Sequence, residues 1–344
     1  MRPWLLHVLR CPECGATPLE LDIDTWREAE FGPSPLAERP CHLHGEADCA
    51  GCASGTIESG TLRCSCGSTY PIEGFVPNLA GDLADEFQED AAETYAYLWE
   101  NFDVERVAGE DDVQKLVTFE EKTGIDPARL DGKLVLDAGC GPGQLIRLLG
   151  VGGAHAVDCD LVVPSVLRSL ERERLFDFVQ ADMLRMPFAR GSFDLVYSIG
   201  VIHHIPDSET VFRELAATTA DDGDFSAWVY GGKGAAFVLC DNAMRAVTTR
   251  LPHGVVKGIS VLTSPLFPLA RRVLGGEKAP ILRKDSEHLI YDWLRTPYRR
   301  FYRESELADL LGDMGWRVGY RSPHPLGLTF RKEGADAVSD APAG

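Results

Sequence analysis

The segment KLVLDAGCGPG, residues Lys133–Gly143, decides the fold. Its first half reads as a buried strand that ends in an acid, its second half is a glycine loop, and the apolar spacing of residues 145–149 predicts a helix directly behind it. Glycine is needed where a backbone turns sharply or where a ligand lies against the main chain. The dinucleotide-binding pattern G-x-G-x-x-G fails at Gln144. The pattern G-x-G-x-G is met instead, by Gly139, Gly141 and Gly143.

Around this segment, short apolar runs alternate with helical stretches over residues 133–230. Such alternation is typical of βαβ units, whose parallel strands form one sheet with helices on both faces. We therefore predict an α/β fold with a doubly wound, mostly parallel sheet. Helices are expected before it, over residues 82–131, and the end of the chain predicts a helix at 304–315 and strands at 316–322 and 326–332.

Acidic side chains end three successive strands of this pattern. Asp137 ends the first, where a cationic amino-acid group could be held, and Asp158 ends the second, where a carboxylate accepts ribose hydroxyls. The third ends at Asp182, which can accept an adenine amino group while Met183 packs against the ring. Turns favour aspartate in any protein, but the ordered series predicts one ligand site at the carboxyl edge of the sheet.

The chain here resembles the class I S-adenosylmethionine (SAM)-dependent methyltransferases, in particular the type-11 family that includes quinone-biosynthesis C-methyltransferases. The likeness covers residues 133–230 and is carried by Val135–Gly143, Val157–Asp158, Ala181–Met183, Phe193–Ser198 and Gly200–Asp207. It implies a seven-stranded sheet and SAM as cofactor. The chain departs from the many relatives that have Lys-Pro-Gly-Gly before the fifth strand, since Ala220–Asp224 stands there, but this surface turn leaves the SAM prediction intact.

The resemblance also implies roles for single residues. Asp137 and the three loop glycines would lie near the methionine part of the cofactor, and Asp158 would lie on the ribose. Asp182 and Met183 would lie on the adenine. Ser198, in the fourth matching stretch, is included in the cofactor-binding set.

Seven of the ten cysteines lie before residue 70. In a cytosolic chain such clustering indicates metal ligation rather than disulfides. The pair Cys11 and Cys14 has knuckle spacing, and the pair Cys64 and Cys66 forms a tighter second half. Together these four thiolates can hold a tetrahedral zinc ion, so we predict a structural zinc there.

The loop between the two pairs leaves alternatives open, because it contains Cys41, His42, His44, Cys49 and Cys52. A single site could instead use Cys11, Cys14, Cys49 and Cys52. A second site could use Cys41, His44, Cys49 and Cys52, and a metal-free ribbon with free thiols is the remaining alternative.

The N-terminal region also resembles zinc-ribbon modules that occur alone as activators of tRNA methyltransferases, and fused ahead of type-11 domains. This resemblance rests on Leu5–Leu6, Leu9–Pro12, Leu62–Cys64, Tyr70–Ile72 and Gly74–Pro77. The expected organisation is a ribbon at 1–80, a helical cap segment at 82–131, a catalytic domain at 132–333 with a helical insertion at about 232–300, and a disordered tail at 334–344.

Two regions are candidates for the substrate side. The aromatic side chains Tyr95, Tyr97, Trp99 and Phe102 lie in a segment that folds over the cofactor in related proteins, although ordinary helix core would have the same spacing. Long insertions often cover an acceptor pocket. The insertion ends in a stretch rich in aromatic residues and arginine (291–303), which could hold an anionic acceptor, face solvent or form a dimer contact.

His203 and His204 follow the fourth strand and are the histidine pair placed to act on an acceptor. An oxygen or nitrogen acceptor must lose a proton, and histidine is the usual base near neutral pH. Side chains alternate along a strand, so the two cannot share one direction if the chain remains extended there. Relatives carry the second histidine in the setting Gly-x-x-His-His-x-Pro-Asp, so we expect His204 to be the base and His203 to point elsewhere. Alternatively, either ring bonds a backbone carbonyl and fixes the loop at Pro206–Asp207.

The net charge of the chain gives information about the class of acceptor. The chain has 53 acidic and 34 basic residues, a net charge of −19, which argues against a general nucleic-acid binder. We predict a methyltransferase with a small-molecule acceptor. The alternatives are an RNA or protein methyltransferase that docks its substrate with the ribbon, and a SAM-binding protein without turnover. Neither a membrane-spanning run nor a signal-peptide cleavage site is found, so we expect a cytoplasmic protein without a membrane partner.

Overall fold

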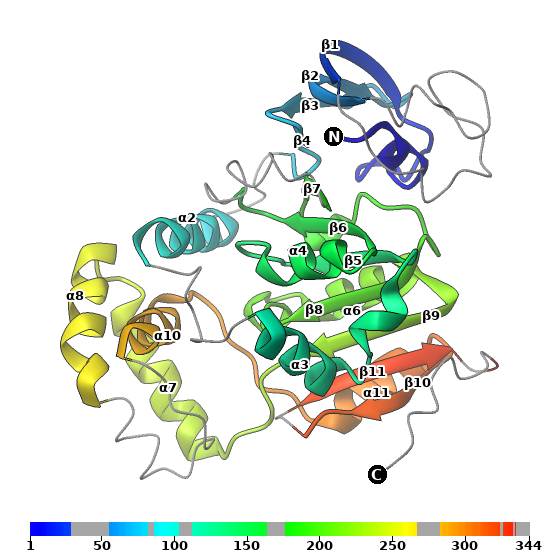
Figure 1. Ribbon diagram of the computed structural model, residues 1–344. Helices are drawn as coiled ribbons and strands as arrows, with labels where there is room; N and C mark the ends of the chain where they lie inside the picture. The colour runs from blue at the N-terminus through cyan, green and yellow to red at the C-terminus, as the bar shows by residue number, and fades with distance from the viewer. Residues whose placement is uncertain are drawn as a thin grey trace.

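The computed structural model of the chain contains two β-sheets and a group of helices beside the larger sheet (Figure 1). It describes residues 1–28, 55–81, 86–102, 112–163, 176–266, 283–323, 326–332 and 334. The alternative metal ligands Cys41, His42, His44, Cys49 and Cys52 lie outside the described residues, as does the tail 335–344.

The larger sheet has seven strands in the order β10-β11-β9-β8-β5-β6-β7. Strands β7, β6, β5, β8 and β9 run parallel, and β11 and β10 pair antiparallel at one edge. Their bounds are β5 Leu134–Ala138, β6 His155–Asp160, β7 Phe176–Gln180, β8 Phe193–Ile199, β9 Thr219–Trp228, β10 Trp316–Arg321 and β11 Gly327–Lys332. This confirms the predicted α/β fold with a seven-stranded, mostly parallel sheet.

Successive residues of the central strand β5 pack on opposite faces of this sheet. Val135 shares a core with α3 (Asp112–Thr123) and α4 (Gln144–Val151). Leu136 shares another with α6 (Ser208–Thr218) and α11 (Glu304–Gly312). Because helices cover both faces, every position of β5 is buried, which explains why the strand reads as a continuous apolar run rather than as an alternating one.

The N-terminal residues form a second, antiparallel sheet of four strands, preceded by a short 3-10 helix. The bounds are η1 Pro3–His7, β1 Glu20–Glu28, β2 Gly55–Arg63, β3 Thr69–Glu73 and β4 Val76–Pro77. This sheet lies next to β7 in Figure 1, and its buried side chains belong to the same core cluster as Leu136 and α6. Leu9 also pairs with Phe188 in an isolated β-bridge, and Arg2 forms an ion pair with Asp177 at 2.6 Å. The two sheets are therefore joined by packing as well as by the chain.

The helical insertion follows β9 and packs on the helix that precedes the large sheet. Its helices are α7 Ala235–Thr248, α8 His253–Thr263, the 3-10 turn η6 Ser264–Leu266, and α10 Arg283–Arg295. They lie together with α2 (Glu86–Asn101) on one side of the molecule (Figure 1), where Leu98, Val256 and Tyr291 form a small buried core. Short 3-10 turns complete the fold: η3 Pro127–Leu130, η4 Met183–Arg185 and η5 Ile202–His204. Among the helices of the described residues, none has the length and apolar character that a membrane span requires.

Candidate functional site

A pocket lies at the carboxyl ends of β6, β7 and β8, beside helix α2. It is lined by Phe87, Gln88, Ala91, Ala92, Tyr95, Asp160, Leu161, Val162, Ala181, Asp182, Met183, Leu184, Val201, His204, Ile205, Pro206 and Asp207. Its volume of about 210 Å³ exceeds the 90 Å³ of a pocket near Lys133 and Asp194, at the amino ends of β5 and β8. Because doubly wound sheets bind ligands at their carboxyl edge, the larger pocket is the candidate site.

The glycine loop needs glycine for two reasons at once. Gly139 and Gly141 have φ angles of 83° and 54°, in the left-handed region that favours glycine. A Cβ at Gly139 would lie 2.7 Å from Val201, and one at Gly141 would lie 2.9 Å from Trp99. Gly143, with φ 69°, is the N-cap residue of α4. At Gly139 and Gly141 the backbone is therefore in close contact with residues around the pocket.

Strand β6 runs two residues further than the sequence analysis expected, and this changes which acid stands at its end. Asp158 is fully buried within the strand, and neither carboxylate oxygen has a hydrogen bond of ordinary geometry among the described residues. Asp160 ends the strand and lines the pocket. Its carboxylate accepts hydrogen bonds from the backbone N–H groups of Gly141 and Val162, at 3.0 and 3.1 Å. The strand-end position expected of Asp158 thus belongs to Asp160.

Three acids lie together at this point: Asp137 and Asp158 are buried, and Asp160 is half-buried at the pocket. Asp137 and Asp158 are neighbours across β5 and β6, and the Tyr197 hydroxyl donates a 2.8 Å hydrogen bond to Asp137. Burial raises the pKa of Asp137 to about 7 against the lowering effect of the Tyr197 bond, and burial also raises the pKa values of Asp158 and Asp160. No ion pair among the described residues includes these acids. Such a cluster favours a cationic ligand, because a buried carboxylate is costly without a positive partner.

The adenine-side residues and Ser198 have different positions. Asp182 and Met183 both line the pocket, and one Asp182 oxygen accepts a 3.0 Å hydrogen bond from the Gln88 amide of α2. Ser198 is fully buried inside the sheet, where its hydroxyl donates to the Ala138 carbonyl at 2.8 Å. Ser198 therefore connects β8 to β5 and is not among the residues that line the pocket.

The aromatic side chains of α2 divide between two faces of the helix. Tyr95 lines the pocket, and Trp99 stacks on it with ring centroids 6.3 Å apart and lies against the glycine loop. Tyr97 and Phe102 face the other way and pack on Tyr291 of α10, at 5.6 and 5.0 Å. One face of α2 thus contributes to the pocket, and the other face is helix core.

His203 and His204 lie in the 3-10 turn η5, after β8 has ended at Ile199. The alternation expected along an extended strand therefore does not apply. His204 lines the pocket, and its Nδ1 is 2.9 Å from the carbonyl oxygen of Tyr298. His203 is fully buried with its ring centroid 3.8 Å from that of Tyr230, and neither of its ring nitrogens has a partner among the described residues. Only His204 reaches the pocket.

The contact with Tyr298 determines which His204 nitrogen carries the proton. A carbonyl can only accept, so Nδ1 donates and Nε2 keeps its lone pair. Burial lowers the pKa of His204, while Asp292 and the bond to Tyr298 act in the opposite direction. His204 is therefore an uncharged imidazole at neutral pH, a form that can take up a proton.

The arginines at the end of the insertion are engaged within the protein. Arg295 pairs with Asp90 at 2.7 Å. Arg299 pairs with Asp241 at 3.0 Å, with side chains 0% and 3% exposed, and its guanidinium stacks on Trp293 at 3.9 Å. No described side chain that lines the pocket is lysine or arginine. The structure thus gives no support to an anion site built from this stretch.

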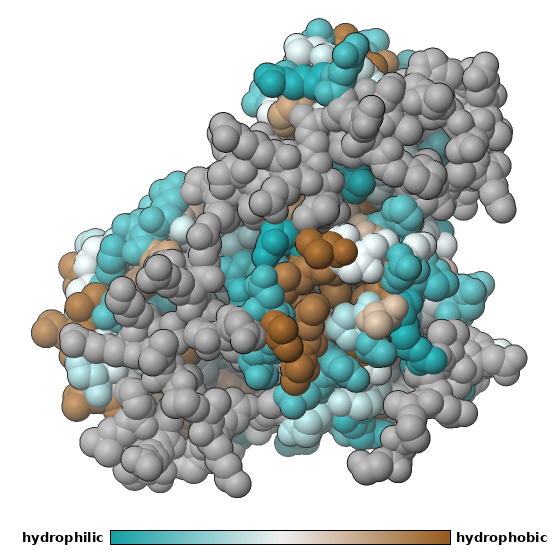
Figure 2. All heavy atoms as spheres, viewed as in Figure 1, coloured by the Kyte–Doolittle hydropathy of each residue, from teal (hydrophilic) through white to brown (hydrophobic). Residues whose placement is uncertain are grey.

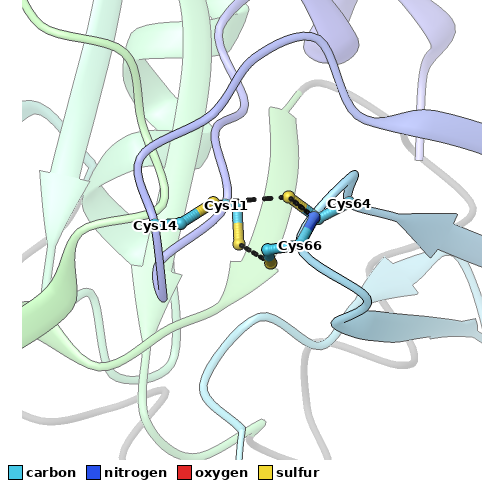
Figure 3. Close-up of side chains that lie close together, drawn as sticks. All are labelled: Cys11, Cys14, Cys64 and Cys66. Carbon is cyan, nitrogen blue, oxygen red and sulfur yellow. Dashed lines mark hydrogen bonds between the residues drawn. The ribbon is translucent and has the colours of Figure 1, made fainter.

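The predicted metal ligands come together at one end of the small sheet. Figure 3 shows the four cysteine side chains directed toward one another from two loops. Their sulfur atoms lie within 4.8 Å of one another, with 3.7 Å between Cys11 and Cys66 and 3.5 Å between Cys14 and Cys64. Tetrahedral zinc with Zn–S bonds of about 2.3 Å places its sulfurs about 3.8 Å apart. The sulfur positions therefore fit a tetrahedral tetrathiolate site.

Sequence reasoning missed several pocket residues. Asp160 could have been found, because it lies two positions after Asp158 and a strand places such residues on one face. Gln88 and the Tyr298 carbonyl could not, because both reach the site from distant parts of the chain.

Comparisons with known proteins agree with this geometry. Residues 136–227 match the family of methyltransferase domains. The sterol 24-C-methyltransferase of Gibberella zeae is 31% identical over 159 residues, which are 42% of this chain and 41% of that protein. The probable tRNA methyltransferase 9B of Mus musculus is 34% identical over 102 residues, 29% of this chain and 22% of that protein. The chain thus spans less than half the length of these curated relatives.

One solved structure matches the chain at low overall similarity. It is the 1,6-didemethyltoxoflavin-N1-methyltransferase of Burkholderia thailandensis, with bound 1,6-didemethyltoxoflavin and S-adenosylhomocysteine. It is 19% identical, with a TM-score of 0.42, and the match covers 80% of this chain and 96% of that one. Residues 136–227 are thus similar to methyltransferase domains.

Proposed function

We propose that this chain is a SAM-dependent methyltransferase that methylates a small molecule. The observation that carries the proposal is the cluster of Asp137, Asp158 and Asp160 beside the glycine loop, which lacks a cationic side-chain partner among the described residues. SAM carries a sulfonium and an ammonium group, so it supplies the positive charge that these acids lack. The family match over residues 136–227 supports the same cofactor.

Particular residues would hold the cofactor. Asp160 would accept the ribose hydroxyls, Asp182 and Met183 would contact the adenine, and Asp137 with the glycine loop would lie near the amino-acid part. When bound, SAM supplies an electrophilic methyl group. The chain contributes alignment and exclusion of water, and the contact of Trp99 with the loop supports a covering role for α2.

On the acceptor side, His204 would take the proton that an oxygen or nitrogen acceptor loses. Its Nδ1 is occupied by the Tyr298 carbonyl, which leaves Nε2 for the acceptor. The low pKa that burial gives this ring keeps it unprotonated and ready at neutral pH.

The proposed function is tested by measuring where a labelled methyl group is transferred. The purified chain would be incubated with methyl-labelled SAM and with a cell extract separated into low-molecular-mass, RNA and protein fractions. We expect label in the low-molecular-mass fraction. Label in RNA or protein would contradict the proposed acceptor class, and the relative named as a tRNA methyltransferase makes RNA the fraction to compare first. SAM binding without label in any fraction would mean a non-catalytic protein.

The two acids of β6 give a sharper prediction about cofactor binding. Asp160→Ala should weaken SAM binding by about 1.5–3 kcal/mol, because it removes a charged hydrogen-bonding group from the pocket. Asp158→Asn, on the same strand, should weaken SAM binding less than Asp160→Ala does, because Asp158 does not line the pocket and would act on the cofactor only through its charge. Calorimetric titration of both variants would decide, and the opposite order of effects would return the ribose role to Asp158.

We also propose that Cys11, Cys14, Cys64 and Cys66 bind one structural zinc ion. The sulfur separations of 3.5 and 3.7 Å support this, as does the exclusively thiolate ligand set, which suits zinc. Closed sites of four protein ligands stabilise a fold and leave no position for a substrate. The zinc would therefore maintain the small sheet beside β7 rather than take part in methyl transfer.

A further inference from the structure

The helical insertion presents an unusually apolar outer surface. Seven of the eleven large hydrophobic side chains that are exposed among the described residues lie between Phe237 and Leu266. They are Phe237, Leu239, Val247, Val255, Val261, Leu262 and Leu266. Leu262 is 80% exposed and Leu239 is 71% exposed. Figure 2 shows hydrophobic residues projecting from the edge of the molecule formed by α8. Single exposed apolar residues are ordinary, but such a concentration marks an interaction surface.

The same segment is almost free of acids. Residues 225–266 contain a single acidic residue, Asp241, although the chain has 53 among its 344 residues. Asp241 is buried and paired with Arg299, so it contributes no negative charge to the surface. Lys233 and Arg250 are exposed and Lys257 is half-buried. The exposed charges that this segment itself contributes are therefore basic, although the chain has a net charge of −19.

The inner sides of these helices already have their partners, so the outer residues are not needed for the core. Val256 is fully buried against Leu98 of α2 and Tyr291 of α10. Arg245 of α7 is buried and donates hydrogen bonds to the carbonyl oxygens of Thr296 and Pro297. The apolar outer surface therefore belongs to helices whose inner faces are fixed by packing and hydrogen bonds.

We propose that the outer surface of α7, α8 and η6, which we call the docking face, binds the surface of an anionic lipid bilayer. Helices that lie on membranes combine exposed apolar side chains with lysine and arginine. No described helix is able to span a bilayer, so the contact is peripheral. A second copy of the chain is a less suitable partner for the docking face than a bilayer. A symmetric contact between two copies would bring the cations of one docking face against those of the other.

The net charge of −19 does not prevent this contact. Charges separated by more than about 8 Å are largely screened at physiological ionic strength, so the face that touches the lipid decides the interaction. Docking would also place the pocket near the bilayer, because α8 packs on α2, whose other side lines the pocket. The docking itself does not depend on the proposed methyltransferase function.

The test uses the full chain and sedimentation with phospholipid vesicles, either of phosphatidylcholine alone or with about 30% phosphatidylglycerol. We expect binding to the anionic vesicles, weaker binding to the neutral ones, and loss of binding at high salt. Leu239→Glu with Leu262→Glu should reduce anionic-vesicle binding by about tenfold or more. Lys233→Glu with Arg250→Glu, which keeps the apolar residues, should do the same.

Val113→Glu with Val151→Glu is the matched control, since both valines are exposed on other helices, at 70% and 62%. This variant should bind vesicles as the unchanged chain does. All variants should bind SAM equally, which separates failure of docking from failure of the proposed function. Absence of anionic-vesicle binding, equal binding to neutral vesicles, or a dimer in sedimentation equilibrium that Leu239→Glu with Leu262→Glu dissociates would each overturn the proposal.

Discussion

Replacement of His204 by alanine is expected to lower the turnover number roughly 10²–10⁴-fold at pH 7 while SAM affinity stays unchanged. His204 lines the pocket as an uncharged imidazole whose Nδ1 proton is held by the Tyr298 carbonyl. An acceptor that must lose a proton then has Nε2 as its base. Steady-state kinetics and calorimetric titration with SAM would measure the two quantities separately.

The bond to Tyr298 also gives His204 a structural role, and a second variant separates the two roles. In His204→Asn the side-chain amide can still donate to the carbonyl, but no basic nitrogen remains. We expect His204→Asn to be as slow as His204→Ala. Recovery of near-normal turnover in the asparagine variant would show that the ring only fixes the loop, and that alignment alone carries the reaction.

The pH profile offers an independent check on the same residue. Burial lowers the pKa of His204 below its ordinary value, so the base form is present from about pH 6.5 upward and is lost only as the pH falls. Turnover should therefore be level above about pH 6.5 and decrease at lower pH. For an acceptor that ionises by itself, the deficit of His204→Ala should shrink as the pH rises.

Loss of the zinc site is expected to destabilise the whole chain rather than the small sheet alone. Cys11 is fully buried in a core cluster that also contains Leu136 of the large sheet and Phe212 of α6. Binding energy of a structural zinc contributes directly to folding. We expect Cys11→Ser to lose the metal and to lower the melting temperature by on the order of 10 °C in a single transition.

Elemental analysis of protein purified without added metal and differential scanning calorimetry would measure these effects. Cys240→Ser is the matched control, because Cys240 is an exposed free thiol of α7 outside the cluster. It should change neither the zinc content nor the melting temperature. A chelator should reproduce the effect of Cys11→Ser in the unchanged chain, and a fully folded, metal-free protein would contradict the zinc proposal.

The parts of the structure that the sequence predicted well depend on local pattern. The apolar run of β5 predicts a buried parallel strand, and the glycines after it predict a tight loop. The structure contains both the strand and the loop. The sequence pattern predicts that the second strand ends at Asp158, two residues earlier than β6 ends in the structure. In the structure the strand continues through Cys159 to Asp160, and Asp158 is buried inside it.

Features that depend on distant contacts were not predictable in the same way. The sequence pattern places His203 and His204 at the carboxyl end of the fourth strand. In the structure the chain turns into η5 there, where the Tyr298 carbonyl fixes the His204 ring and Tyr230 covers the His203 ring. The arginine-rich stretch suggested an anion site because its acidic partners lie far away in the sequence. Asp241 is 58 positions from Arg299, a separation at which no local pattern reveals the pairing.

Calorimetric titration of the unchanged chain with SAM would determine whether the pocket beside the glycine loop is a cofactor site. We expect SAM and S-adenosylhomocysteine to bind at about one equivalent per chain, and Asp160→Ala to bind SAM about 10–150-fold more weakly. NAD should not bind, because the loop has Gln144 where the dinucleotide pattern needs glycine. Tight binding of NAD together with absence of SAM binding would show that the pocket is not a SAM site.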